Sequence, residues 1–233
     1  MNYKNSEKGR SMVEMMGYLM VMMSVIVAIG KIVSSAFNNH RYSTATMQVT
    51  DLATSMVKAA ALDVDYTFVI EDVNGDNKMK IIPPNFRKVG KKLFHVFGGE
   101  VKIEESPNYD PDCCEEMGYC DEKCKRKDQF SITYAGLNKK QCIELAMKNW
   151  TKNQYVDLYA VYINDIGWFW LAYGDSKGKG DELTQLDSGE CGKDADGKTI
   201  CAFPMKRSIL TGTGGDSVGQ CAESGNNITW VFN

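Results

Sequence analysis

The sequence predicts an α+β fold, in which one long N-terminal helix precedes a mostly antiparallel sheet. Three observations indicate it. An apolar stretch and then an amphipathic stretch fill the first 62 residues, with no Pro or Gly between Lys31 and Leu62. Short strand-like segments follow, and most of the 21 glycines lie in the second half of the chain. All eight cysteines lie after residue 112.

The apolar stretch has the length of a membrane anchor. Met15 to Gly30 are 16 residues without a charge, or roughly 24 Å of helix, against about 30 Å for a bilayer core. Lys31 can snorkel, and Ile32 to Phe37 extend the apolar surface. We therefore expect a membrane-spanning helix within residues 10–37.

Two features distinguish this segment from a conventional secretory signal. Glu14 stands at the head of the apolar run, where signal peptides normally have no acid. No small-x-small cleavage site precedes a polar mature start. A simple uncleaved anchor is the alternative interpretation.

Residues 38–62 predict an amphipathic continuation of the same helix. The apolar positions recur every three or four residues, as one helical face requires, and are Tyr42, Ala45, Val49, Leu52, Met56 and Ala60. The residues expected on other faces are Asn39, Arg41, Gln48, Asp51 and Lys58. A single helix over residues 10–62 would be roughly 80 Å long.

The remaining chain predicts strands and one short helix. Expected strands lie at residues 66–70, 78–82, 129–137, 155–163, 168–173, 198–204 and 227–232, with a further strand that follows a Gly98–Gly99 turn inside residues 94–103. Residues 138–150 predict a helix with Asn138 as its N-cap.

The string KGRSMVEMMGYL, residues 8–19, resembles the processing site of type IV prepilins. That family has a short basic leader that ends in Gly, then a mature helix whose fifth residue is Glu. The resemblance implies that a prepilin peptidase cuts after Gly9 and N-methylates Arg10, although Arg is not the usual apolar first residue. It implies four parts: a leader (1–9), a hydrophobic transmembrane and assembly helix (10–37), its amphipathic continuation (38–62) and a disulfide-rich head (63–233).

Glu14 is the fifth mature residue on this reading. A carboxylate in hydrocarbon costs up to about 3 kcal/mol at the bilayer centre and less near the interface. In the pilin family its partner is the amino terminus of a neighbouring subunit, which implies an assembly contact between Glu14 and Arg10 of two copies. The alternative is an intrahelical bond from Glu14 to Arg10, in the weaker orientation, worth about 0.2–0.5 kcal/mol.

The head carries a second resemblance. The segments FGGEVKI and FSITYAGLNKKQCIELA, with a late cysteine before NITWVF, resemble type IVb-like pilin heads, including the PilS type. This implies a type IV pilin-like architecture and a disulfide between Cys142 and Cys221.

The other cysteines are assigned from their spacing. Cysteines confined to one part of an exported chain predict disulfides in an oxidising compartment. Cys191 and Cys201 flank the turn signal DADG, so they could close a hairpin. Adjacent Cys113 and Cys114 rarely bridge each other, so each is expected to pair with Cys120 or Cys124, in either arrangement.

Several motifs resemble parts of other sites, but the spacing of their residues does not match those sites. DVNGDNK starts like a calcium loop at Asp72, but Asn77 replaces the sixth-position Gly and Pro83 the twelfth-position Glu, so a polar turn is favoured. The cysteines at 113–124 lack the paired spacing of zinc sites. The two histidines, His40 and His95, belong to no nucleophile–base pattern. We expect no catalytic residue, metal or cofactor.

Together these observations predict a structural subunit, a pilin or pseudopilin that polymerises through its N-terminal helix. The expected partners are copies of the chain, a prepilin peptidase and a pilus or type II secretion machinery. The net charge of −3 and the lack of a basic face predict no nucleic-acid partner. The precursor would lie in the bacterial inner membrane, and the mature chain in an extracellular filament. The alternative is a single-pass anchored adhesin or binding module that does not polymerise.

Overall fold

The structure is a computed structural model of the chain. It describes residues 6–61, 66–106, 127–148, 150, 158–164, 167–170, 191–193, 199–201, 205–211 and 221–233. The chain divides into two compact units, Met1–Ser43 and Thr44–Asn233. The second unit, called the head below, therefore includes the C-terminal part of the first helix.

The long helix that the sequence predicts is present as α1, Ser6–Ala60. It begins earlier than residue 10, so Gly9 and Arg10 lie inside it. After Ala60 the Ala61 N–H still donates to the Val57 carbonyl at 2.9 Å. The apolar part of α1 contains only the glycines at 17 and 30. Neither is enough to end so long a helix, because a helical Gly costs only about 1 kcal/mol relative to Ala.

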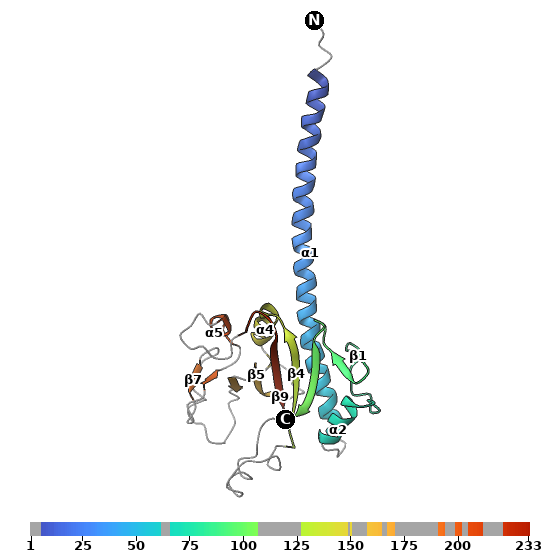
Figure 1. Cartoon of the computed structure of the whole chain (residues 1–233), viewed down its shortest axis with the longest axis vertical. Helices are drawn as coiled ribbons and strands as arrows, with labels where there is room; N and C mark the ends of the chain where they lie inside the picture. The colour runs from blue at the N-terminus through green and yellow to red at the C-terminus, as the bar shows by residue number, and fades with distance from the viewer. Residues whose placement is uncertain are drawn as a thin grey trace. The chain divides into compact units, whose positions relative to one another are not determined.

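The head is built on an antiparallel sheet of seven strands, drawn in Figure 1. Their order across the sheet is β1-β2-β3-β4-β9-β5-β6. The strands are β1 (Arg87–Val89), β2 (Lys92–Phe94), β3 (Glu100–Glu105), β4 (Phe130–Leu137), β9 (Asn226–Phe232), β5 (Leu158–Ile163) and β6 (Gly167–Trp170). The last strand of the chain thus lies in the centre of the sheet, between β4 and β5. A separate hairpin pairs β7 (Cys191–Lys193) with β8 (Thr199–Cys201).

The α+β class is therefore as the sequence predicts. The expected segments after residue 94 overlap β3, β4, β5, β6, β8 and β9, whereas β7 falls in none of them. The turn before β3 uses both glycines as expected. Gly98 has φ +93, and a Cβ on Gly99 would overlap the Ala135 carbonyl oxygen and the His95 ring. Glycine is required at both positions, because one needs left-handed backbone and the other has no room for a side chain.

The C-terminal part of α1 packs on the sheet through its predicted apolar face. Ala45, Val49, Leu52 and Met56 are fully buried. The Tyr134 hydroxyl on β4 lies 3.5 Å from the Ala45 carbonyl. The core therefore forms between this face of α1 and one face of the sheet. Apolar side chains recur every three or four residues on the helix and every second residue on the strands, so each element presents one apolar face.

Two expected strands are wrong. Residues 66–70 belong to a helix, α2 (Tyr66–Asn74), which buries Val69, Ile70 and Val73. These three positions, i, i+1 and i+4, fall on one helical face, and they pack near β3. The β-branched side chains of this segment suggested a strand, but tertiary packing of the face decided the outcome.

Residues 78–82 form a turn in place of the expected strand. The backbone N–H groups of Ile81 and Ile82 donate to the Asn77 side-chain oxygen at 2.9 and 3.2 Å. Asn77 and Lys80 both have left-handed backbone, with φ of 50° and 54°. Because these donors are engaged locally, they are not available to a sheet ladder.

Two further helices lie in the described part of the head. The predicted helix after Asn138 is α4 (Lys139–Ala146), whose N-terminus has a capping box formed by Asn138 and Gln141. The Trp150 indole N–H then donates to the Leu145 carbonyl at 3.0 Å. The short helix α5 (Arg207–Thr211) lies against α4.

Candidate functional site

The first unit presents an apolar surface on every side of its helix. From Met12 to Phe37, all 17 large apolar side chains are exposed, with exposed fractions of 45–74%. They include six methionines, which adapt to irregular packing surfaces, at positions 12, 15, 16, 20, 22 and 23. By length and composition, α1 is apolar enough to cross a membrane, with a mean hydropathy of 2.0 over its most apolar window.

Glu14 lies on this apolar unit as an exposed acid. Its side chain makes no ion pair or hydrogen bond with any residue that the structure describes. The side chain of Arg10 is outside the described part, so its expected contacts stay predictions. Lys31 is likewise exposed, and it has no such bond to a described residue either.

The disulfide that the pilin resemblance implies is present. Cys142 on α4 is bonded to Cys221, with a Cα–Cα distance of 5.8 Å across a sequence separation of 79 residues. Both residues are buried. The bond ties α4 to the chain that enters β9, and Cys221 N–H also donates to the Leu210 carbonyl at 3.1 Å.

Of the remaining six cysteines, two lie in the β7–β8 hairpin and four lie outside the described residues. Cys191 and Cys201 lie directly opposite each other on β7 and β8, as the predicted hairpin requires. Their side chains are outside the described part, so their bridge stays a prediction. Cys113, Cys114, Cys120 and Cys124 also lie outside the described residues.

A buried polar network joins α1 to the sheet inside the head. Gln48 is 1% exposed, although the helical pattern placed it outside the apolar face. Its side-chain oxygen accepts from Val96 N–H at 3.1 Å and lies 3.4 Å from the Tyr134 hydroxyl. Its amide nitrogen donates to the Asn85 carbonyl at 2.6 Å. Gln48 is buried because the β2–β3 turn and the segment before β1 supply partners from far along the chain.

His95 extends this network on the other side of Tyr134. The two rings are stacked, with centroids 4.5 Å apart. His95 Nδ1 accepts from Phe97 N–H at 3.2 Å. Nε2 therefore carries the proton and donates to the Ala135 carbonyl at 3.1 Å. Burial raises the pKa of Tyr134 well above its usual value. The pKa of Tyr66 is also raised, mainly by burial and secondly by Asp128.

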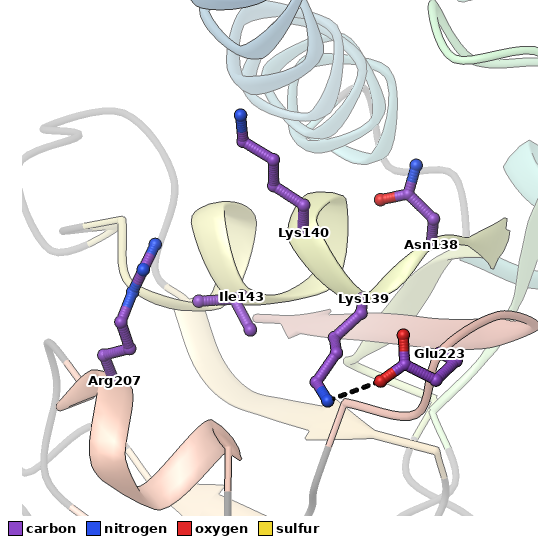
Figure 2. A pocket seen from close by; sticks show the side chains of 6 residues that line it. All are labelled: Asn138, Lys139, Lys140, Ile143, Arg207 and Glu223. Atoms are coloured by element: carbon purple, nitrogen blue, oxygen red, sulfur yellow. Dashed lines mark hydrogen bonds and ion pairs between the residues drawn. The ribbon is translucent and has the colours of Figure 1, made fainter.

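One surface hollow of the head, of about 490 Å³, is lined by basic side chains at the start of α4 (Figure 2). Lys139 pairs with Glu223 at 2.7 Å, and Arg207 with Glu144 at 2.9 Å. Lys140 extends away from the first of these pairs (Figure 2). Among the described residues that line this hollow, none is a nucleophile with an adjacent base. Its charges are those of solvated surface ion pairs.

A second hollow, between α2 and β3, is lined by the acids Glu71, Glu104 and Glu105. Glu105 accepts from the Thr67 hydroxyl at 2.8 Å. Among the described residues, no group of three or more His, Cys, Asp or Glu side chains is arranged to hold a metal ion.

The calcium-like segment that starts at Asp72 uses its oxygens for local structure. The Asp72 carboxylate accepts from Lys78 N–H and Met79 N–H at 2.9 and 3.1 Å. Asn74 donates to the Ile103 carbonyl at 2.9 Å. The segment is thus the hydrogen-bonded polar turn that its sequence favours.

Comparison with known proteins gives no family assignment. No protein-family model matches the chain, and no curated protein matches it significantly. The function is therefore inferred from the chain itself.

Proposed function

We propose that this chain is a structural subunit, a type IV pilin or pseudopilin, that polymerises through the apolar part of α1. The observation that carries the proposal is the exposure of all 17 large apolar side chains between Met12 and Phe37. Soluble monomers rarely expose contiguous apolar surface of this extent. A bilayer, and later a bundle of identical helices, would each remove it from water.

The single acid at the head of this surface favours assembly over anchoring alone. Glu14 does not help a simple anchor, because a carboxylate makes insertion of the helix into lipid less favourable. In a bundle, a positive group of another copy neutralises the carboxylate. The pilin resemblance gives that role to the N-terminus at Arg10.

Maturation and location follow from the same proposal. A prepilin peptidase would cut after Gly9 and methylate the amino group of Arg10. The subunit would wait in the inner membrane, and a pilus or type II secretion machinery would move it into an extracellular filament. The bonded cysteines Cys142 and Cys221 suit a head that works in an oxidising compartment.

Two measurements on the full chain, expressed with its assembly machinery, test the proposal. Mass spectrometry of the mature protein is expected to find a methylated N-terminus at Arg10. Electron microscopy is expected to show filaments for the wild type and few or none for Glu14→Ala and Gly9→Ala. Gly30→Ala is the matched control, because a Cβ at Gly30 meets no atom within 4 Å.

A purified protein that still begins at Met1 and stays monomeric in the membrane would contradict the proposal. That result would favour the single-pass adhesin or binding module. Normal filaments from both Glu14→Ala and Gly9→Ala would contradict the assigned roles of these two residues.

A further inference from the structure

The apolar part of α1 contains two opposite charges. Between Ser11 and Asn39, only Glu14 and Lys31 carry a formal charge. Both are exposed, and neither has an ion pair or hydrogen bond with a described residue. Every large apolar side chain around them is exposed as well. When this surface is removed from water, each charge needs a counter-charge, because an unpaired buried ion is strongly disfavoured.

The two charges cannot meet within one chain. Lys31 follows Glu14 by 17 residues on a continuous helix, so they are separated by roughly 25 Å along the helix axis and by about 100° around it. The side chains cannot bridge such a distance. Neither charge can therefore neutralise the other within one chain, whereas a second copy can supply both counter-charges.

We propose that Glu14 of one copy pairs with Lys31 of a second copy that is displaced by roughly 25 Å along the shared helix direction. This inference rests on the proposed function and adds a second contact to it. The second copy is the partner because the same chain supplies both the acid and the base, at a fixed spacing on the same apolar surface. One contact then neutralises both internal charges.

The geometry of this pair specifies an open assembly. Glu14 and Lys31 face different directions around the helix, so each copy uses one side to offer its acid and another to offer its lysine. A head-to-tail contact of this kind repeats along a helix and need not close. A two-fold pair of parallel helices would place Glu14 beside Glu14, where like charges repel.

The contact differs from that between Glu14 and Arg10. Arg10 precedes Glu14 by four residues, so that contact needs a displacement of only about 6 Å. The two contacts therefore belong to different neighbours in the assembly. Lys31 would set the longer of the two displacements.

A reciprocal charge exchange tests the pair in the full chain, with filaments measured by sedimentation and electron microscopy. Glu14→Lys and Lys31→Glu are each expected to lower the filament yield by at least about tenfold, because each places like charges together in an apolar contact. In the double variant the contact between positions 14 and 31 is restored with its signs reversed, but the new lysine at position 14 still faces the N-terminus of another copy. We therefore expect a yield above that of Glu14→Lys alone and below that of the wild type. Lys31→Arg, which keeps the charge, is the matched control and should assemble normally.

The outcomes separate the pair from the proposed function. Normal filaments from Lys31→Glu, or no recovery in the double variant, would overturn the Glu14–Lys31 pair while wild-type filaments still support the pilin role. The absence of filaments from the wild type would overturn both.

A cross-linking measurement covers the case in which the charge variants fail to enter the membrane. Val21→Cys and Asn38→Cys are combined in the otherwise native chain. They are also 17 residues apart, and each lies seven residues after Glu14 or Lys31, on nearly the same face of the helix. Oxidation is expected to give a ladder of covalent multimers, and the single variants should give none. A double variant without a ladder would overturn the displacement.

Discussion

Gln48 and Tyr134 illustrate how single polar residues hold the head together. Gln48 belongs to α1, Tyr134 to β4, and their side chains meet with the turn between β2 and β3. A satisfied buried network specifies one arrangement of its elements, because any other packing leaves donors and acceptors without partners. These residues therefore fix the register of α1 on the sheet more than the apolar contacts alone would.

Replacing Gln48 by Met tests this role, since Met has a similar shape and no strong hydrogen-bonding group. The Val96 N–H would lose the acceptor that it has at 3.1 Å, so we expect the free energy of unfolding to fall by about 1–3 kcal/mol. Chemical denaturation measures it. Met47→Leu is the control, because Met47 is 49% exposed, and a loss for Gln48→Met no larger than the control's would contradict the role.

Tyr134 gives a prediction for alkaline pH. Burial raises its pKa in the folded protein, whereas the unfolded side chain ionises near pH 10. Its contribution to stability is therefore complete below about pH 10 and declines as the pH rises above that value, because only the unfolded state loses the proton. We expect denaturation midpoints between pH 8 and 11 to fall less steeply for Tyr134→Phe than for wild type.

The control for this pH series is Tyr18→Phe, because Tyr18 is 73% exposed on the apolar unit. The pKa of Tyr66 is also raised. Because Tyr66 is present in every variant, part of the loss of stability at alkaline pH remains in all of them. Parallel curves for wild type and Tyr134→Phe would show that Tyr134 ionises equally in both states.

At the scale of elements, α2 depends on a contact at its C-terminus. The last carbonyls of a helix have no partner within it. The Lys88 ammonium, on β1, donates to the Val73 and Gly75 carbonyls at 3.2 and 2.8 Å. A cation at this end also complements the helix dipole. The edge strand thus stabilises a helix that the sequence alone does not reveal.

Removing that cation should therefore weaken α2. For Lys88→Met we expect a loss of about 1 kcal/mol in the free energy of unfolding and faster amide exchange near residues 75–79, since the helix end loses its cap. Lys92→Met is the matched control, because Lys92 only pairs with Glu100 at the surface, 3.2 Å away, and such pairs contribute little. Equal effects of the two substitutions would contradict the capping role.

At the scale of the molecule, the two units need different surroundings. The unit Thr44–Asn233 buries its own core, which includes Leu52, Tyr134 and Trp230. Its Cys142–Cys221 bond lies wholly within it. The first unit buries none of its large apolar side chains between residues 12 and 37.

A fragment of residues 44–233 tests this division. We expect it to be a soluble monomer that keeps the Cys142–Cys221 bond, whereas the full chain should need detergent, because the exposed apolar surface is absent from the fragment. Size-exclusion chromatography with light scattering and mapping of disulfide peptides measure both properties. An aggregated or reduced fragment would show that the head needs the first 43 residues to fold.

The sequence by itself determined the features that depend on local pattern. The uninterrupted apolar and amphipathic stretches predict α1, alternation predicts most strands, and Asn138 with Gln141 predicts the start of α4. The positions of Glu14 and Lys31 on the apolar helix also follow from the sequence, because a helix converts residue numbers directly into distance and direction.

The tertiary structure alone decided the features that depend on contacts between distant residues. Gln48 is buried because Asn85 and Val96 bring partners to it, and residues 66–70 are helical because β3 covers one of their faces. The central place of β9 arises in the same way, since its neighbours β4 and β5 are distant in sequence. Local periodicity cannot specify which distant segment will cover a given face, and that choice set the architecture of the head.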